Sequence, residues 1–333
     1  MIPRSLLYKV FTVFILLFII AVLWSMQQSR RDYTDIVFLD VGQGDGSLMD
    51  IHNKNSNPIR VMIDTGKNRQ VTSSIDKFYS HNIINYLSST IISNDIDTLI
   101  LTHNDSDHIG MRCEIINRYN VKNIIISDSM STSSLLACDT DNYIKNKLMA
   151  QNKIENKLIN KTYADINNIE KDFITLNYVH TGDTISVGNI NLKVLNPNNN
   201  NTQKPKSKSN LDNRNSIVVL LEAYNNKILF TGDIDKKVEM EIVNADLNST
   251  PTPSPSRMGR GIRNIDILKV AHHGSDGSSG DIFIKYIKPK VSVISVGKNN
   301  YGHPSSRVID DLTSASSTIH RTDQEGNVMF HFE

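Results

Sequence analysis

Four side chains that can bind a metal ion lie within six consecutive positions of this sequence. They are His103, Asp105, Asp107 and His108, and they follow the apolar, strand-like run 97–101. The spacing is too tight for one face of a helix and too irregular for one face of a strand, but it suits a loop that wraps an ion. Mixed nitrogen and oxygen ligands favour Zn²⁺ or Mn²⁺ over a cysteine-rich structural zinc site. The alternative is a polar turn with two solvated histidines.

Further ligand-type residues stand where other strand-like runs end. They are Asp64, Asp233, His272 and His273. A two-metal hydrolytic site needs two sets of terminal ligands and one bridging carboxylate, with the metals about 3.5–4 Å apart. The residues present meet that requirement, and Asp233 is the natural bridge. We therefore predict hydrolysis by a metal-activated hydroxide.

Short strands and a few helices are expected to position these side chains. Strands are predicted at 35–39, 59–63, 99–101, 121–126, 190–195, 216–222, 227–230, 266–270, 291–296 and 327–332. Helices are predicted at 75–92, 109–119, about 134–160 and 305–312. A hairpin turn is predicted at Asn225 and Asn226. Side chains at strand ends can converge on one edge of a sheet, which favours a single site.

The composition sets broader limits on function. The formal net charge of +1 over 333 residues gives no overall signature of nucleic-acid binding, so such a substrate would need local basic patches. Candidate patches are Lys204, Lys206 and Lys208, then Arg257, Arg260 and Arg263, unless these are only solvated charges. Cys113 and Cys138 are the only cysteines, and the sequence leaves open whether they form one bridge or two semi-buried thiols.

The N-terminal region has a pattern typical of a membrane anchor. Positions 6–24 are apolar except for Lys9 and Thr12, and a helix of about 19 residues would be roughly 28 Å long, close to the hydrocarbon thickness of a bilayer. A cleaved signal peptide is the alternative, but no small-residue cleavage site follows. We expect an anchor or signal sequence in 1–30 and a hydrolase domain in 34–333. Basic residues flank the run on both sides, so its orientation stays open.

Six motifs, in order, resemble the metallo-β-lactamase superfamily and, within it, the ComEC/Rec2-like competence branch. They read FLDVGQGD at 38–45, IDTG at 63–66, LTHNDSDHIG at 101–110, LFTGD at 229–233, LKVAHHGS at 268–275 and SVGKNNYGHP at 295–304. The resemblance covers about 36–332. It implies an α/β (α+β) fold, an αββα four-layer sandwich with a metal site at one edge of the two sheets.

The resemblance also implies roles for individual residues. His103 and Asp105 would hold a first ion, Asp107, His108 and His272 a second, and Asp233 would bridge them. Asp107 would also orient the attacking water, and His303 would act near the site as proton donor or phosphate contact. Either His272 or His273 can be the ligand, and His272 is preferred. The candidate supporting or substrate-contacting residues are Asp40, Asp45, Asp64, His273, Asn215 and Asn300.

Two departures from the superfamily pattern bear on the metal. Asp105 stands where the wider superfamily has histidine, and a further histidine expected just before position 216 is missing, with Asn213 and Asn215 in that region. The first site is therefore rich in oxygen. That composition weakens Zn²⁺ there and favours Mn²⁺, or leaves one metal in place of two.

The resemblance points to a phosphodiester substrate, with single-stranded DNA as a candidate. Full-length channels of this branch carry many membrane spans, whereas one at most is expected here, so we expect a membrane-anchored nuclease with its catalytic domain outside the cytoplasm. Two alternatives stay open. One is a hydrolase of small esters, lactones or cell-wall phosphoesters, and the other is a metal-poor binding module that partners a membrane complex.

Overall fold

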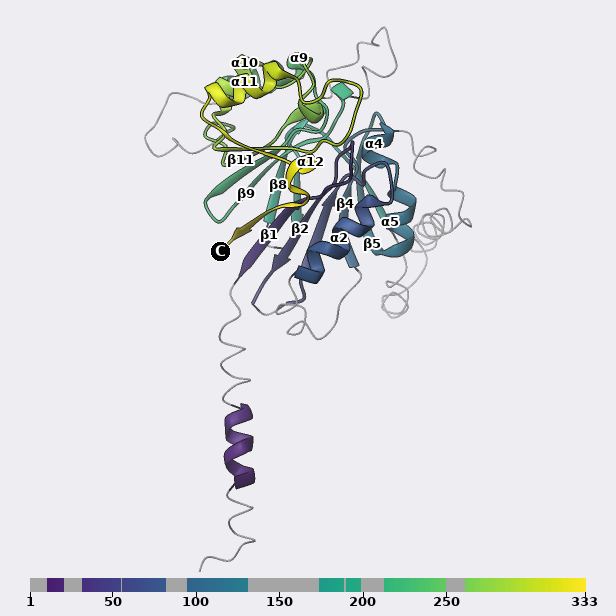
Figure 1. The fold of residues 1–333 in the computed structure, drawn as a ribbon, viewed down its shortest axis with the longest axis vertical. Helices are drawn as coiled ribbons and strands as arrows, with labels where there is room; N and C mark the ends of the chain where they lie inside the picture. Colours follow the sequence, from purple (N-terminus) through teal and green to yellow (C-terminus); the bar gives the residue numbers. More distant parts are fainter. Residues whose placement is uncertain are drawn as a thin grey trace, which may run out of the picture.

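The structure is a computed structural model of the 333-residue chain (Figure 1). It describes residues 11–20, 32–54, 56–81, 95–130, 174–188, 190–198, 213–249 and 261–333. The helix predicted at about 134–160 lies outside these ranges, as do Cys138 and the basic positions 204, 206, 208, 257 and 260.

The first of two sheets has seven strands in the order β14-β1-β2-β3-β4-β5-β6. They are β1 (Tyr33–Phe38), β2 (Ser47–His52), β3 (Ile59–Ile63), β4 (Asp95–Ile100), β5 (Asn120–Ser127), β6 (Thr175–Val179) and β14 (Val328–Phe332). Pairs from β14 to β3 are antiparallel, and pairs from β3 to β6 are parallel.

The second sheet repeats this arrangement in the order β13-β12-β11-β10-β9-β8-β7. Its strands are β7 (Thr184–Val187), β8 (Ile190–Asn196), β9 (Val218–Ala223), β10 (Asn226–Phe230), β11 (Ile267–Lys269), β12 (Val291–Ile294) and β13 (Thr318–Arg321). Pairs from β7 to β10 are antiparallel, and pairs from β10 to β13 are parallel. The expectation of an α/β protein with two mixed sheets is confirmed.

Helices connect most of the parallel strands, as crossovers of this kind require, and a short one, α12, follows β13 and leads to β14. They are α2 (Gln70–His81), α4 (Ser106–Ile109), α5 (Arg112–Arg118), α9 (Lys236–Ser249), α10 (Asp281–Ile287), α11 (Ser306–Ser314) and α12 (Thr322–Glu325), with a short 3₁₀ turn, η3 (Ala271–Gly274). In Figure 1, α9, α10 and α11 lie over the outer side of the second sheet, and α2 and α5 lie beside the first.

Three apolar clusters hold these layers together. Alternate residues of β1 show the reason, because side chains along a strand point to opposite faces. Ile36 and Phe38 face the second sheet in the central cluster, while Val37 and Leu39 pack in the cluster that includes α2 and α5. A third cluster joins the second sheet to α9, α10 and α11. The order of layers is helix, sheet, sheet, helix.

Several predicted elements differ from the structure. Strands β2, β6, β7 and β13 and helices α9, α10 and α12 were not predicted. The helix predicted at 109–119 corresponds to α5 and is shorter, while the ligand-bearing segment predicted as a loop contains the short helix α4, which ends before Gly110. The helix predicted at 75–92 begins earlier, at Gln70, and its part beyond His81 lies outside the described residues. The hairpin turn lies at Tyr224 and Asn225, one residue earlier than predicted, since Ala223 pairs with Asn226.

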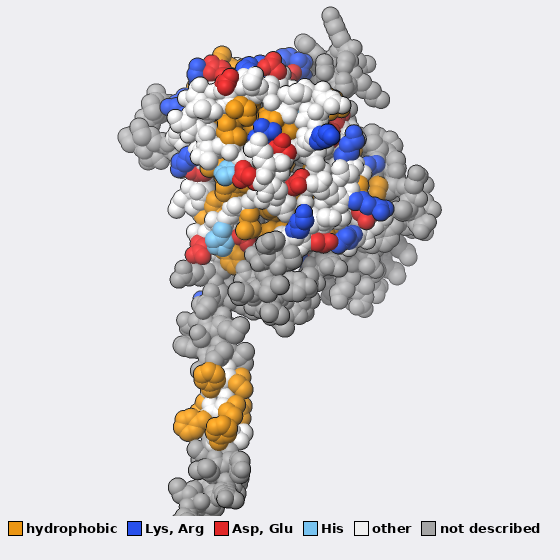
Figure 2. All heavy atoms as spheres, in the orientation of Figure 1, with side chains coloured by type: hydrophobic (Ala, Val, Ile, Leu, Met, Phe, Trp, Pro, Cys, Tyr) orange, Lys and Arg blue, Asp and Glu red, His pale blue; other side chains and the backbone are white. Residues whose placement is uncertain are grey.

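The predicted anchor is described only in part. Residues 11–20 are helical and their side chains are exposed, and they form the apolar segment at the bottom of Figure 2. Within the described ranges, no helix is both long enough and apolar enough to cross a membrane. Cys113, in α5, is disulfide-bonded, which resolves the choice between a bridge and a free thiol.

The position of Phe38 in the central cluster predicts that the stability of the protein depends strongly on the size of this side chain. This ring is fully buried between the sheets, with its centroid 5.7 Å from that of Phe230. We expect Phe38→Ala to lower the free energy of unfolding by about 3–5 kcal/mol, because it leaves a cavity. Met329→Ala, at a position 49 % exposed on the paired strand, should change it by no more than about 0.5 kcal/mol. Chemical denaturation measures both, and equal losses would contradict the layered core.

Candidate metal centre

The candidate ligands come from the carboxyl ends of strands in both sheets. Asp64 follows β3 and the segment 101–110 follows β4, while Asp233 follows β10 and His272 and His273 follow β11. Parallel strands end on the same side of a sheet, which is where α/β proteins commonly bind ligands. A hydrogen bond from Ile217 N to the Thr102 carbonyl oxygen, 3.0 Å long, joins the two sheets at this edge.

The Nδ1 side of the His108 ring is held by a carboxylate. Its ring is fully buried, and Nδ1 lies 2.7 Å from Asp64 Oδ2. An ionised carboxylate only accepts hydrogen bonds, so Nδ1–H is the donor. The other ring nitrogen, Nε2, faces Asp233 Oδ1 at 3.1 Å. Asp64 has a φ of 59°, which is uncommon for a residue other than glycine.

His103 is oriented through Thr102. The Thr102 hydroxyl donates to Asp64 Oδ2 at 2.7 Å, and Thr102 N donates to Asp64 Oδ1 at 2.8 Å. The hydroxyl has one proton, so its oxygen must accept the hydrogen bond from His103 Nδ1, 3.0 Å away. Nε2 of His103 is thereby directed to the other side, 3.9 Å from Asp233 Oδ2 and 3.7 Å from Asp105 Oδ2.

The second sheet fixes the orientation of the His273 ring in a similar way, with Nδ1 bonded and Nε2 facing the cluster. Its Nδ1 donates to the Ser295 carbonyl oxygen at 2.9 Å, and its Nε2 lies 3.3 Å from Asp107 Oδ2. Both His272 and His273 have left-handed φ values, 50° and 54°, so the chain turns sharply directly after β11. His273 is 1 % exposed, whereas the His272 side chain is 32 % exposed, with Nε2 3.6 Å from Asp233 Oδ2.

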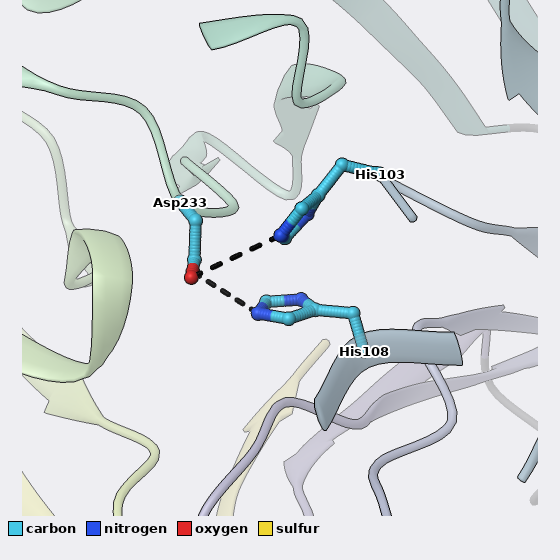
Figure 3. A group of neighbouring side chains, drawn as sticks. All are labelled: His103, His108 and Asp233. Atoms are coloured by element: carbon cyan, nitrogen blue, oxygen red, sulfur yellow. Dashed lines mark ion pairs between the residues drawn. The ribbon is translucent and has the colours of Figure 1, made fainter. Parts of the chain in front are cut away.

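Asp233 lies at the centre of these imidazoles. It is 2 % exposed, and its backbone N–H donates to Ser216 Oγ at 3.2 Å. In Figure 3, the rings of His103 and His108 both point toward the Asp233 carboxylate. Its Oδ2 is also 3.8 Å from His273 Nε2. One carboxylate therefore contacts ring nitrogens delivered by both sheets.

The facing atoms are buried without hydrogen-bond partners. Within the described ranges, this holds for Nε2 of His103, His108 and His273 and for Oδ1 of Asp233, whose short contacts lack hydrogen-bond geometry. Buried polar atoms are almost always paired, so a convergent set of unpaired nitrogen and oxygen atoms is unusual. Imidazole nitrogens and a carboxylate are ligands of divalent metals. The residues present therefore fit a bound metal ion.

Three groups of ligand atoms lie close enough to share an ion. They are His103, His108 and Asp233; Asp107, His108 and His273; and Asp45, Asp64 and His108. The third group already has a cation, since Lys269 Nζ lies 2.8 Å from Asp45 Oδ2 with both side chains buried. The first two groups share His108, and they are the candidate positions for metal ions.

The carboxylates control the protonation of the imidazoles. Burial by itself would lower the pKa of His273, but the carboxylates of Asp233 and Asp45 outweigh it and raise the pKa to about 10. Burial likewise opposes charge on His108, and Asp233 and Asp64 raise its pKa well above the usual value. The same histidines hold the pKa of Asp233 well below its usual range despite its burial. The buried imidazoles and carboxylates therefore favour each other's charged forms.

Other predicted residues lie around this cluster. The side chains of Asp105 and Asp107 are 38 % and 25 % exposed, on the side open to solvent. Asp45 contacts His273 Nδ1 at 3.2 Å, and the His303 ring lies 5.5 Å from that of His272. Asp40 accepts a hydrogen bond from Gly42 N, and neither Asn215 nor Asn300 forms a hydrogen bond with the ligands among the described residues.

Several supporting residues were missed from the sequence. They are Thr102, Ser216, Lys269 and Ser295, each of which orients a ligand or balances its charge. Lys269 had a usable signal, because a charged residue inside an apolar strand needs a buried partner. The others act through a hydroxyl or a backbone carbonyl, for which the sequence carries no distinctive pattern.

Metal affinity should rise steeply with pH. The raised pKa values favour the protonated forms of His108 and His273, so a bound ion competes with protons for their Nε2 atoms. Calorimetric titration of Mn²⁺ or Zn²⁺ in buffers of different ionisation enthalpy should show proton release and tighter binding from pH 6 to 8. The stability that the protonated His273 ring gives the protein is full below about pH 6.5 and is lost as the pH rises through about 10. A metal affinity that does not change with pH would contradict this coupling between the carboxylates and the imidazoles.

Thr102→Val tests the relay from Asp64 to His103. It removes one hydroxyl and leaves Asp64 Oδ2 and His103 Nδ1 without that partner, so we expect metal affinity to fall about 10–100-fold. Thr313→Val is the matched control, since Thr313 is exposed on α11. Equal metal affinity in the two variants, measured by the same titration, would exclude the relay.

Comparisons with known proteins identify relatives of this chain. ComE operon protein 3 of Bacillus subtilis (strain 168) is 28 % identical over 307 residues, which are 90 % of this chain and 33 % of that protein. Recombination protein 2 of Haemophilus influenzae is 25 % identical over 88 % of this chain and 28 % of its own length. Competence protein ComA of Neisseria gonorrhoeae is 30 % identical over 38 % of this chain and 17 % of its own length. The chain thus spans a third or less of these relatives.

Solved structures are similar at a lower level. The metallo-β-lactamase fold protein YhfI from Bacillus subtilis matches 90 % of this chain and 100 % of its own, with 12 % identity and a TM-score of 0.46. CmlA, a diiron β-hydroxylase from Streptomyces venezuelae, matches 90 % of this chain and 54 % of its own, with 12 % identity and a TM-score of 0.45. At these scores the likeness says nothing about the site.

No family model matches the sequence. The similarity to ComE operon protein 3 and to Recombination protein 2 nevertheless runs through nearly the whole chain, including both sheets and the ligand-bearing strand ends. The resemblance to the ComEC/Rec2 competence branch that the motifs indicate is confirmed by these relatives.

Proposed function

We propose that this protein is a metal-dependent hydrolase of phosphodiester bonds and that single-stranded DNA is its substrate. The observation that carries the proposal is the convergence of three buried, unpaired imidazole nitrogens on Asp233. The names of the relatives refer to competence and recombination, processes that act on DNA. The cofactor in this proposal is one or two divalent ions, Zn²⁺ or Mn²⁺.

The proposed ligands form two sets that share Asp233. His103, Asp105 and Asp233 hold the first ion, and Asp107, His108 and Asp233 hold the second. The sequence preferred His272 as a further ligand of the second ion. The distances favour His273 there, because its Nε2 is buried 3.3 Å from Asp107 Oδ2.

His272 is the better candidate for the first ion. Its Nε2 lies 3.6 Å from Asp233 Oδ2, the same oxygen that is 3.9 Å from His103 Nε2. In that position it would supply the imidazole that the sequence lacks before position 216.

The chain's own groups then have distinct tasks. Divalent ions bound here would lower the pKa of a water molecule and offset charge on the phosphoryl oxygens. Asp107 orients the attacking water, since its carboxylate is partly exposed beside the buried ligands. His303 donates a proton to the leaving oxygen from the outer side of the cluster, where its ring lies 5.5 Å from that of His272.

The location of the enzyme is part of the proposal. Residues 34–333 form the hydrolase domain, and residues 1–30 attach it to the membrane with the domain outside the cytoplasm. The exposed apolar side chains at 11–20 support attachment. The disulfide of Cys113 supports an oxidising compartment, where such bonds persist.

Asp233→Asn tests the shared carboxylate. Removing one charge at the centre should lower the cleavage of single-stranded DNA with Mn²⁺ or Zn²⁺ by at least about 100-fold, more than the loss of a residue that only supports a ligand. It should also lower the number of bound ions in metal analysis. Asp281→Asn, in an exposed ion pair with Lys285 on α10, is the control and should keep full activity.

A second substrate separates the alternatives. Bis-p-nitrophenyl phosphate is a small diester that any metallohydrolase of this type can attack. Cleavage of it with DNA left intact would contradict the nuclease and favour a hydrolase of small esters or cell-wall phosphoesters. A purified protein without any bound metal would favour a binding module.

A further inference from the structure

Tyr301 is an exposed aromatic ring beside the metal centre. It is 72 % exposed, more than any other large apolar side chain recorded for the described residues. Its ring centroid lies 5.7 Å from that of His303, which in turn lies 5.5 Å from His272 and 6.4 Å from His273. A row of rings therefore runs from a buried candidate ligand out to solvent.

The loop that presents Tyr301 is fixed by one side chain. Asn299 Nδ2 donates to the carbonyl oxygens of Gly297 at 2.9 Å and His303 at 2.8 Å. Its Oδ1 accepts from Tyr301 N at 3.0 Å and from His303 N at 3.1 Å. These four hydrogen bonds close the loop around Asn299, so the exposure of the ring does not come from a loose segment.

Close packing holds both ends of this loop against other parts of the site. A Cβ on Gly297 would lie 2.4 Å from Gln43 N, so the loop touches the segment that contains Asp45. A Cβ on Gly274 would lie 2.6 Å from Pro304 Cβ, and Ser305 N donates to the Gly274 carbonyl oxygen at 2.9 Å. The position of Tyr301 relative to the ligands is thus set by the fold.

The groups around the ring suit a nucleotide. Lys298 is exposed on the same loop, and it has no ion pair among the described residues. His303 Nδ1 is buried and has no hydrogen-bond partner within the described ranges. An ammonium group can meet a phosphate, and an exposed aromatic face stacks with any unpaired base. Cell-wall phosphoesters offer no flat aromatic partner for that face.

We infer that Tyr301 is a stacking platform for an unpaired nucleobase next to the scissile phosphate, which makes the substrate a single-stranded polynucleotide. This inference rests on the proposed phosphodiesterase function. Stacking on Tyr301 positions the strand, and Lys298 contacts its backbone. A base paired in a duplex has no free face to offer, so duplex DNA is excluded from this contact.

Binding of labelled oligonucleotides to the full-length protein tests the platform. The probes are a 15-nucleotide oligo-dT and an abasic strand of the same length, which has the same phosphates and no bases. Fluorescence anisotropy should show that Tyr301→Ala weakens oligo-dT binding roughly 5- to 150-fold, the effect of one stacked base. Binding of the abasic strand should change less than two-fold. Tyr301→Phe should retain oligo-dT binding, and Tyr178→Ala, an exposed tyrosine on edge strand β6, is the matched control.

Tyr301→Trp adds a spectroscopic readout. Its fluorescence should be quenched, in a saturable way, by oligo-dT and not by the abasic strand. If the Tyr301→Ala variant bound both strands as the wild type does, the platform would be overturned, and continued DNA cleavage would leave the proposed function standing. If the wild type neither cleaved DNA nor bound oligo-dT, the proposed function and the platform would fail together.

Discussion

The metal centre depends on how the carboxylate of Asp64 is satisfied. Asp64 is 1 % exposed and accepts hydrogen bonds from Thr102 N, Thr102 Oγ and His108 Nδ1 at 2.7–2.8 Å. Burying a carboxylate costs much free energy unless such donors surround it. Once they do, the Nδ1 side of both His103 and His108 is committed, and both Nε2 atoms must face Asp233. A single buried acid thereby sets the direction of two ligands.

The two sheets supply the rest of the geometry. Their parallel halves end at one edge, where the first sheet delivers His103 and His108 and the second delivers Asp233 and His273. Charge balance accompanies this arrangement, since Lys269 pairs with Asp45, the buried carboxylate that also contacts His273. Close backbone contacts lock the edge, because a Cβ on Gly44 would lie 2.4 Å from the Asp107 carbonyl oxygen. The same close packing therefore stabilises the fold and positions the ligands.

The motifs in the sequence predicted much of this site, and geometry explains what they could not predict. Short apolar runs that lead into ligand residues located β3, β4, β10 and β11 and the ligand types that follow them. Short or polar strands such as β6 and β7 gave no such signal, and their place is decided by pairing with β5 and β8. The helix α9 was missed because its polar and charged residues outnumber its apolar residues, which become a face only when packed on the second sheet. Which of His272 and His273 turns inward depends on two left-handed residues, a feature that spacing alone does not reveal.

Anomalous X-ray diffraction from crystals soaked in Mn²⁺ or Zn²⁺ tests the central claim most directly. The account predicts a peak with His108 Nε2 and an oxygen of Asp233 at about 2.0–2.2 Å, while His108 Nδ1 stays hydrogen-bonded to Asp64. His273 Nε2 or His103 Nε2 should complete the set. A peak bound through Nδ1 of these rings, or no peak beside Asp233 in a fully soaked crystal, would contradict it.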